Sequence, residues 1–332
     1  SGQGDGYPTS IVGSSVNRGN FMTLDKNVVT VSDTALTVMN SSANQSINRQ
    51  HSFNSPVLQA TSGKYLIYNL GGNGFKIEGS SDTIYSGNTS NNIIAGDIAG
   101  SGRYALVTET QGYPSSLSVY LTDNTVQYKY DFSEYYVTDI SLNSDGTRAA
   151  VSGITAKDGG IVSAVYIFDF SNPEPISILT YNEVLMEKVE YMDNGTVAAI
   201  GDTTTSMING TTGEKVDYNY QSRQMTDYAI DKNRVALALT PYDNQSASKL
   251  VILDSSASEK CVIESQDKID AVSLYGDTAA ILTDSTITGY SASSGNSFST
   301  AEAGSDARGI ALADEATVYV LGVSQIRQAR FS

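Results

Sequence analysis

The sequence predicts an all-β fold, an eight-bladed β-propeller of four-stranded antiparallel blades. One cassette recurs eight times along the 332 residues: a short apolar run, a tight polar turn and a second apolar run. Aligned on the residue that closes the turn, successive copies are 37, 39, 44, 49, 37, 44 and 39 residues apart. The mean spacing is about 41 residues, the length of one propeller blade. The turn-closing residues are Asn27, Lys64, Arg103, Thr147, Thr196, Asn233, Asp277 and Ala316.

Each cassette is expected to form the first hairpin of a blade. Its turns use Asp-Gly, Asn-Gly, Ser-Gly or Lys-Asn, residues that tolerate a positive φ. A third apolar strand follows, as at 164–168 and 249–253, and a more polar fourth strand, as at 125–130 and 215–220, completes the blade. Longer loops between the second and third strands are expected at 109–116, 155–163 and 240–248.

The two ends of the chain are expected to share the last blade. The eighth cassette is followed by a single further strand, at 325–331. An unpaired sheet edge there would invite aggregation. The strand-like segment 9–15 precedes the first cassette without a blade of its own, so we expect it to supply the missing outer strand. This gives a flexible N-terminal tail over 1–8 and a single propeller domain over 9–332.

The composition fits a folded acidic protein and disfavours several partners. Hydrophobic residues make up 40% of the chain and charged residues 17%, which is not the composition of a disordered chain. The formal net charge is -16. Because nucleic-acid binding needs a basic surface, no nucleic-acid partner is expected. No apolar run approaches the ~18 residues that span a bilayer. The chain lacks an initiator Met, so an upstream signal peptide or anchor is expected to have been removed.

Several kinds of chemistry are excluded or disfavoured by residue counts. His51 is the only histidine, so a metal site with two histidines is impossible and a serine-histidine hydrolase could use only this residue. The single cysteine, Cys261, permits no internal disulfide and is interpreted as a small buried hydrophobic residue. The chain contains no Trp, which disfavours the propeller classes whose signatures contain it. A pair of carboxylates suffices for glycosidase or lyase chemistry, and the chain has 36 Asp and Glu.

A set of acids in the inner strands forms the first candidate site. Carboxylates gathered at one mouth of a propeller would focus negative potential and could hold Ca²⁺ or Mg²⁺. The alternative is that each carboxylate accepts a hydrogen bond from the backbone of the adjacent blade's turn. No other cofactor is expected. The residues are Asp97, Asp139, Asp227 and Asp270, with Glu187 in a roughly equivalent place.

The second candidate site is aromatic. The loops that enter each blade and the long loops between second and third strands fall on one face of a propeller. Tyrosines on that face offer a flat apolar ring and a hydroxyl, which suit contacts to sugars or peptides. The alternative is that several of them fill gaps between blades. The candidate ligand-binding residues are Tyr113, Tyr135, Tyr136, Tyr181 and Tyr242.

Several segments in the first half of the chain form a recognisable set: Gly102–Tyr113, Leu117–Tyr120, Val137–Gly146 and Ser163–Asp169, preceded by Asn54–Leu58 and Tyr65–Gly72. Together they resemble the DUF5711 family of uncharacterised bacterial proteins, although Asn69 stands in place of an expected Asp. The resemblance implies an extracytoplasmic propeller domain behind an N-terminal membrane anchor, and it brings no catalytic residues.

The sequence therefore favours a non-catalytic, extracytoplasmic binding domain, either secreted or anchored at the cell surface. Its expected partner is a protein, a peptide or a glycan, and a monomer is expected. The alternative is a carbohydrate-active enzyme, a glycosidase or lyase with paired carboxylates at the channel mouth. A third interpretation, a structural spacer, applies if no loop cluster converges.

Overall fold

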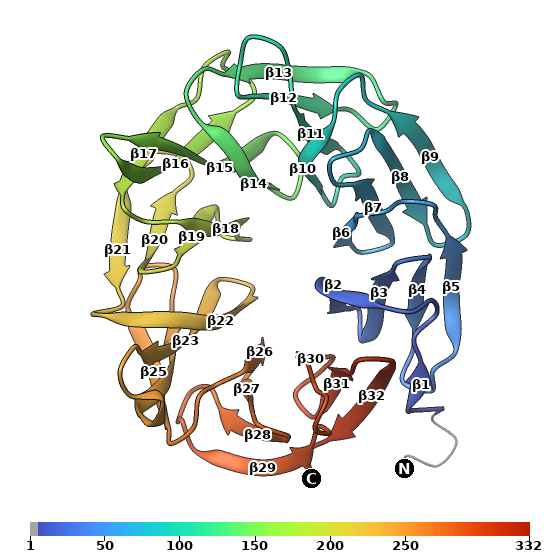
Figure 1. The fold of residues 1–332 in the computed structure, drawn as a ribbon, viewed down its shortest axis with the longest axis vertical. Coiled ribbons are helices and arrows are strands. Elements are labelled where there is room, and N and C mark those ends of the chain that lie inside the picture. The colour runs from blue at the N-terminus through green and yellow to red at the C-terminus, as the bar shows by residue number, and fades with distance from the viewer. Residues whose placement is uncertain (1–5) are drawn as a thin grey trace. The chain divides into compact units, whose positions relative to one another are not determined.

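The computed structural model describes residues 6–332, and these form an eight-bladed β-propeller (Figure 1). Each blade is a four-stranded antiparallel sheet. In seven blades the strands are hydrogen-bonded in chain order, and every predicted cassette forms the first hairpin of a blade. The predicted fold class is confirmed.

The described chain divides into two compact units of four blades each. The expected single domain over 9–332 stays a prediction. Blades are numbered here in chain order. The first unit contains blades 1, 6, 7 and 8, and the second contains blades 2 to 5, together with 255–257.

In the second unit the strands have the following bounds. Blades 2 and 3 are β6 (Pro56–Thr61), β7 (Lys64–Asn69), β8 (Gly74–Gly79) and β9 (Thr83–Asn88), then β10 (Ile93–Ile98), β11 (Tyr104–Thr108), β12 (Ser115–Tyr120) and β13 (Val126–Phe132). Blades 4 and 5 are β14 (Tyr136–Leu142), β15 (Arg148–Lys157), β16 (Gly160–Asp169) and β17 (Ser177–Asn182), then β18 (Met186–Tyr191), β19 (Thr196–Gly201), β20 (Thr204–Asn209) and β21 (Lys215–Asn219).

In the first unit the order is the same. Blades 1 and 6 are β2 (Val16–Leu24), β3 (Asn27–Ser32), β4 (Ala35–Met39) and β5 (Gln45–Gln50), then β22 (Arg223–Asp231), β23 (Arg234–Pro241), β24 (Ser248–Leu253) and β25 (Glu259–Ser265). Blades 7 and 8 are β26 (Ala271–Tyr275), β27 (Thr278–Thr283), β28 (Thr286–Ser291) and β29 (Ser297–Glu302), then β30 (Gly309–Leu312), β31 (Thr317–Leu321), β32 (Gln325–Arg330) and β1 (Thr9–Ser10). A 3₁₀-helix, η1 (Gln245–Ala247), precedes β24.

The N-terminal strand completes the last blade, as predicted. The strand order of that sheet is β1-β32-β31-β30, and Thr9 pairs with Ile326. The backbone N–H of Ile11 donates to the carbonyl of Ser324 at 3.0 Å, which extends the pairing by one residue. The closing strand is therefore shorter than the predicted segment 9–15.

The expected flexible tail over 1–8 is only partly within the described residues. Residues 1–5 lie outside them, and the expectation is wrong for Tyr7. The Tyr7 ring packs edge-on against the Tyr319 ring, with 5.4 Å between the ring centroids. The Tyr7 hydroxyl donates to the carbonyl of Asn40 at 2.7 Å. Packing against a buried ring holds this part of the chain in place.

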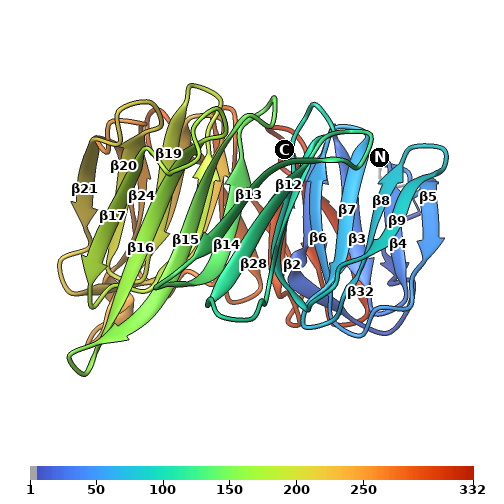
Figure 2. The ribbon, with the colours of Figure 1, turned by 90° about the horizontal axis from the view of Figure 1, so that it is seen from above.

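Blade 4 departs from the sequence expectation of a long loop at 155–163. Instead, β15 and β16 are ten residues each and pair as far as Lys157 and Gly160. Asp158 and Gly159 both have positive φ and close the hairpin, the arrangement of a two-residue turn. Figure 2 shows this hairpin extending beyond the other strands of its unit. The alternating residues before and after the turn continue the strands where a loop was expected.

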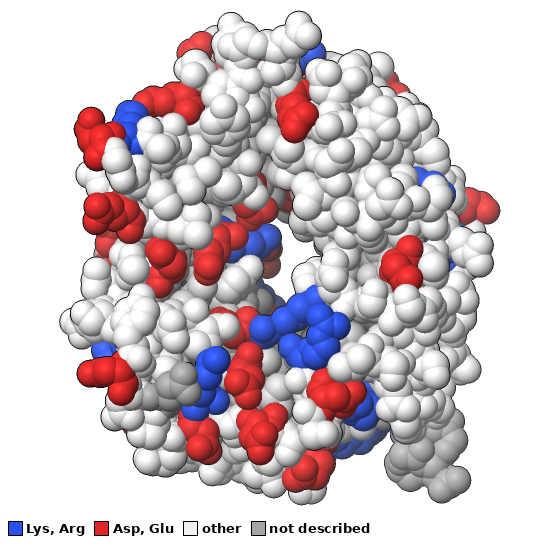
Figure 3. Space-filling view, in the orientation of Figure 1, with Lys and Arg blue, Asp and Glu red and all other residues white. Residues whose placement is uncertain are grey.

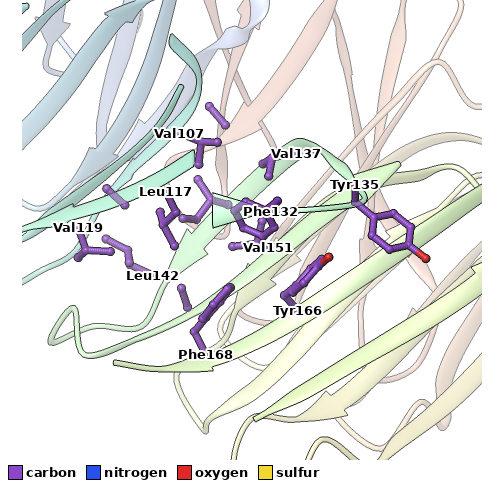
Figure 4. Packing of buried hydrophobic residues seen from close by; sticks show 14 of the residues in the cluster. Val107, Leu117, Val119, Phe132, Tyr135, Val137, Leu142, Val151, Tyr166 and Phe168 are labelled. Carbon is purple, nitrogen blue, oxygen red and sulfur yellow. The ribbon is translucent and has the colours of Figure 1, made fainter. Parts of the chain in front are cut away.

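The apolar faces of neighbouring blades form the core within each unit. In the second unit, β12 to β16 contribute a continuous cluster that includes Phe132, Tyr166 and Phe168 (Figure 4). The rings of Phe132 and Tyr166 meet edge to face with 4.9 Å between their centroids, a favoured aromatic geometry. Within residues 6–332 no helix has the length and apolar character that crossing a bilayer would require.

Candidate functional site

The predicted acids occupy different positions along the first strands of their blades, so they are not equivalent. Several of these strands carry a register shift, after which Asp139 pairs with Ser152 and Asp227 with Ala238. In blade 5 the residue at this position is Lys188, which pairs with Ile200. Asp97 lies two residues beyond the corresponding shift in β10, and Asp270 lies just before β26. The predicted acids therefore do not share one register position in their blades.

Three of the acids join adjacent blades through backbone hydrogen bonds. Asp139 Oδ2 accepts from the N–H of Val189 at 2.9 Å. The same bond joins Asp227 Oδ2 to the N–H of Val272 at 2.8 Å. These bonds satisfy donors of the next blade's first strand. The alternative interpretation expected these bonds at the turn of the adjacent blade, whereas the donors Val189 and Val272 lie within its first strand.

Asp97 makes the third such bond, and Asp270 makes a different one. Asp97 Oδ2 accepts from the N–H of Leu142 in the next blade at 2.7 Å. Asp270 Oδ2 instead accepts from the N–H of Asp284, within its own blade, at 3.2 Å. Among the described residues no group of three or more His, Cys, Asp or Glu side chains could hold a metal ion. The expected Ca²⁺ or Mg²⁺ site at Asp97, Asp139, Asp227 and Asp270 is not supported.

A polar cavity of about 250 Å³ lies in the second unit, at the end of the first strands of blades 2 to 5. Asp97, Lys188, Glu190 and Tyr191 contribute to its wall. Lys188 Nζ lies 3.7 Å from both Asp139 Oδ2 and Glu190 Oε2. One ammonium group thus lies within 4 Å of two carboxylates, and Asp97 lines the same cavity.

Burial changes the acidity of two carboxyl groups in this cavity. Loss of hydration raises the pKa of Asp97 to about 7, although the hydrogen bond from Leu142 favours the charged form. Burial also raises the pKa of Glu190, against the opposing effect of Lys188. A carboxyl group that titrates near neutrality can exchange a proton with a bound molecule. This cavity is therefore the part of the second unit best suited to acid-base chemistry.

The first unit has its own charged contact, which the sequence did not suggest. Four residues of β2, Asn17 to Asn20, bulge out between the pairs Val16–Ser32 and Phe21–Thr30. The bulge carries Arg18 to Asp227 of blade 6, where Arg18 Nη2 lies 2.6 Å from Asp227 Oδ2. Burial raises the pKa of Asp227, and the Arg18 guanidinium opposes that rise. The pair lies beside a cavity of about 350 Å³.

Three of the five tyrosines predicted to bind a ligand are exposed to solvent. Tyr113, Tyr136 and Tyr242 are 46%, 59% and 64% exposed. Tyr113 and Tyr136 belong to the second unit and Tyr242 to the first. Tyr113 lies between β11 and β12, and Tyr136 begins β14.

Tyr135 and Tyr181 are buried, so their expected role in ligand contact is corrected. Tyr135 is 2% exposed and packs at one end of the aromatic cluster (Figure 4). Its ring centroid lies 6.1 Å from that of Tyr166. Tyr181 packs with the blade 4 and blade 5 core, and the Lys215 ammonium lies 4.5 Å from its ring centroid. Burial raises the pKa of Tyr181 to about 12. Both residues fill gaps between blades, the alternative the sequence left open.

His51 is engaged by the backbone of its own neighbourhood. Its Nε2 lies 2.8 Å from the carbonyl oxygen of Ser32, and its Nδ1 accepts from the N–H of Phe53 at 3.0 Å. With both ring nitrogens engaged, His51 stabilises the end of blade 1 and is not arranged as a catalytic base.

Sequence reasoning missed an exposed apolar surface at the tip of the β15–β16 hairpin. Ile161 is 46% exposed there, and Leu185, at the entry to blade 5, is 37% exposed. Ile161 lines a cavity of about 390 Å³, with Lys157, Asp158 and Glu183 also in its wall. The alternation from Ile154 to Ile161 around Asp158-Gly159 is a hairpin pattern that could have predicted this element.

The eight four-stranded sheets define an eight-bladed β-propeller, and each of its two units has a polar cavity and at least one exposed tyrosine. The family model of DUF5711, described as a family of unknown function, matches residues 7–330. The chain therefore belongs to the DUF5711 family. No curated protein matches the chain in sequence.

Solved propellers share the fold at low sequence identity. The computationally designed Ika8 protein is 14% identical, with a TM-score of 0.66 over 98% of this chain and 100% of that one. BamB from Moraxella catarrhalis is 10% identical, with a TM-score of 0.59 over 98% and 100%. The C-terminal WD40 domain of Sif2 is 10% identical, with a TM-score of 0.68 over 98% of each chain. These likenesses show the fold alone.

Proposed function

We propose that this chain is a non-catalytic binding domain that acts outside the cytoplasm and recognises a protein, peptide or glycan. The observation that carries the proposal is the loop face of blades 3 to 5, where Tyr113, Tyr136, Ile161 and Leu185 are all exposed. Exposed aromatic and aliphatic side chains held by a rigid scaffold are typical of binding surfaces. The location outside the cytoplasm rests on the family resemblance.

The catalytic alternative has weaker support on this face. Asp97, Asp139 and Asp227 each accept a backbone hydrogen bond from the next blade through Oδ2, so one oxygen of each carboxylate already joins two blades. The exposed tyrosines lie at the opposite ends of the strands from Asp97. A rigid propeller that presents apolar side chains on loops fits recognition without chemistry.

The proposal is tested by screening the purified chain on a glycan array and with immobilised peptides, then measuring ligand affinity in variants. Tyr113→Ala and Tyr136→Ala should each weaken binding by about tenfold, which is about 1.4 kcal/mol. Tyr242→Ala reports whether the first unit takes part. Tyr275→Ala, an exposed tyrosine at the far end of its strand, is the matched control. Unchanged affinity in Tyr113→Ala and Tyr136→Ala would place the site elsewhere.

One observation favours a second function, a carbohydrate-active enzyme. Asp97 and Glu190 line one cavity, and burial raises the pKa of both. A carboxyl group with a raised pKa can act as the acid of a glycosidase beside a second carboxylate. Release of reducing sugar from a panel of polysaccharides, lost in Asp97→Asn and in Glu190→Gln, would establish this function. Turnover that survives both substitutions would rule out this cavity as the active site.

A further inference from the structure

A segment of β2 in the first unit leaves its sheet and reaches a distant blade. Its four residues, Asn17 to Asn20, stand opposite the single residue Val31 of β3, and we call them the β2 arm. The blades of this unit adjoin in the order 6, 7, 8 and 1, through β22, β26, β30 and β2. Blades 7 and 8 therefore lie between the arm's own blade and Asp227 of blade 6, which the arm contacts.

Both ends of the arm are fixed, and the part between them is exposed. Before the arm, Arg308 Nη1 donates to the carbonyl of Val16 at 3.0 Å. After it, the Thr23 hydroxyl donates to the carbonyl of Leu312 at 2.6 Å. The first three residues of the arm are exposed, and a Cβ at Gly19 would meet no atom within 4 Å. The middle of the arm therefore has open space beside it.

Arg18 of the arm occupies a pair of acceptors on blades 6 and 7. Its Nη2 lies 2.6 Å from Asp227 Oδ2 and donates to the carbonyl of Asp270 at 3.4 Å. Its stem crosses Gly309, where a Cβ would lie 3.5 Å from Arg18 Cγ and Nε. The Arg18 side chain is 41% exposed and that of Asp227 18%. A carboxylate and a carbonyl thus bind a guanidinium that reaches them from the solvent side.

The strand next to Asp227 does not supply a cation, unlike the strand next to Asp139. Both acids follow a register shift and accept from an N–H of the next blade. In blade 5, Lys188 directly precedes the donor residue and lies 3.7 Å from Asp139 Oδ2. In blade 7, Ala271 precedes the donor Val272. The positive charge beside Asp227 therefore comes from the arm and not from the neighbouring strand.

Asp227 needs that charge because little of its carboxylate reaches water. Burial raises the pKa of Asp227, and the Arg18 guanidinium opposes the rise. A carboxylate left buried without a partner is costly. If the arm moved away, a guanidinium from another chain would restore the pair.

The surroundings of the pair suit an arginine side chain and the residues beside it. The adjoining cavity of about 350 Å³ has apolar and aromatic side chains in its wall: Phe21, Tyr228, Val272 and Ile310. Ligand sites typically combine such a wall with a few polar groups. Figure 3 shows a group of basic side chains over β2 and β30, with acidic side chains beside it over β22 and β26. The net charge of -16 attracts a cationic segment from a distance.

We propose that Asp227 and the Asp270 carbonyl form a binding site for an arginine side chain, that Arg18 fills it in the free chain, and that an arginine of a partner peptide replaces Arg18. Partly exposed ion pairs contribute little to stability, so a peptide arginine with further contacts along the cavity can displace the arm. The inference goes beyond the proposed function, because Tyr113 and Tyr136 belong to the second unit and this site to the first.

The experiment measures fluorescence anisotropy with three labelled peptides. The first carries one arginine between leucines, which suit the apolar wall. The second replaces the arginine by citrulline, which has a similar shape without the charge, and the third replaces it by lysine. Arg18→Ala should bind the arginine peptide at least about tenfold more tightly than the unmodified chain, because the site is no longer filled. The citrulline and lysine peptides should bind this variant more weakly, since only a guanidinium combines the charge with a planar set of donors.

Matched variants test whether the gain comes from the arm. Arg330→Ala removes an exposed arginine of the same unit and changes the net charge equally, so its affinity should match that of the unmodified chain. Arg18→Ala with Asp227→Asn should lose the gain, because the amide carries no charge. Arg18→Gln keeps the stem without the charge and opens the site if Arg18→Ala does not fold. Circular dichroism melts check the folding of each variant.

The outcomes distinguish a ligand site from a purely structural contact. If neither Arg18→Ala nor Arg18→Gln binds the arginine peptide more tightly than the unmodified chain does, Arg18 only joins two blades and the inference is overturned. An equal gain in Arg330→Ala, or a gain that survives Asp227→Asn, overturns it by placing the peptide elsewhere. Equal binding of the lysine or citrulline peptide overturns the assignment to arginine.

Discussion

Tyr135 and Tyr136 are adjacent in sequence and lie on opposite faces of blade 4. Tyr135 is 2% exposed, in the core shared with blade 3, whereas Tyr136 is 59% exposed on the loop face. The alternation of side chains along an extended chain gives two neighbouring tyrosines different roles.

Substituting each tyrosine by Ala should separate stability from recognition. Tyr135→Ala should lower the free energy of unfolding by about 3 kcal/mol, because it leaves a cavity beside Tyr166. Tyr136→Ala should change it by less than about 0.5 kcal/mol, as exposed substitutions usually do. Urea unfolding followed by circular dichroism measures both. Equal effects of the two substitutions would contradict the assigned burial.

The bond between Asp139 and Val189 should contribute measurably to stability. Asp139→Ala leaves the buried N–H of Val189 without its acceptor and should cost about 1–3 kcal/mol of unfolding free energy. Asp139→Asn keeps an acceptor oxygen and should cost less. Asp267→Ala, at an exposed acid of blade 6, is the control. If Asp139→Ala unfolds at the same urea concentration as the unmodified chain, this bond does not stabilise the blade pair.

Asp97 should make stability depend on pH. Its pKa is raised from 3.8 to about 7 in the folded chain, so the folded state binds this proton more tightly than the unfolded state. The stabilising contribution is complete below about pH 3.8 and is lost as the pH rises through about 7. At about 1.4 kcal/mol per pKa unit, the loss is at most about 4 kcal/mol.

Asp97→Asn should therefore flatten this part of the pH profile. Relative to the unmodified chain, the variant should gain stability between pH 4 and pH 8, because the amide carries no charge at any pH. Burial also raises the pKa of Glu190, so this residue should keep part of the dependence of stability on pH in the variant. Urea unfolding at several pH values measures the effect, with Asp82→Asn at an exposed position as the control. Parallel profiles for Asp97→Asn and the unmodified chain would refute the assignment.

Removing the closing strand should destabilise blade 8. Deletion of residues 1–12 removes the pairing of Thr9 and Ser10 with β32, and with it the buried side chain of Ile11. The melting temperature should fall by at least about 5 °C, since about 1 kcal/mol shifts it by ~2–4 °C in domains of 150–250 residues. Deletion of residues 1–5 alone is the control. If the longer deletion melts within about 2 °C of the full chain, β1 does not close the blade.

The sequence predicted the elements well, because turns and apolar alternation are local properties. Each of the eight cassettes became a first hairpin, and the chain ends met in one sheet. The side-chain placements were harder to predict. A register shift between Val137 and Asp139 changes which residues face the core, and sequence alternation does not reveal it.

The candidate site shows the same limit. Asp97 and Asp139 occupy similar dipeptides, Gly-Asp-Ile and Thr-Asp-Ile, yet they lie two residues apart in the aligned strands. Tyr135 and Tyr181 looked like loop tyrosines because burial between blades depends on the neighbouring sheet. The exposed apolar end of the β15–β16 hairpin was missed because the 155–163 segment was expected to be a loop.

The sharing of blade 8 by both chain ends sets the order of events during synthesis. Thr9 and its partner Ile326 are 317 positions apart. At about 5–20 residues per second, β1 leaves the ribosome roughly 15 to 60 s before β32 exists. During that interval Ile11 has no blade 8 to pack against and Thr9 has no strand to pair with. Blades 1 to 7, each built from a contiguous stretch of chain, have no such wait. The pairing of β1 thus waits for β32, which is made after every other strand of the propeller.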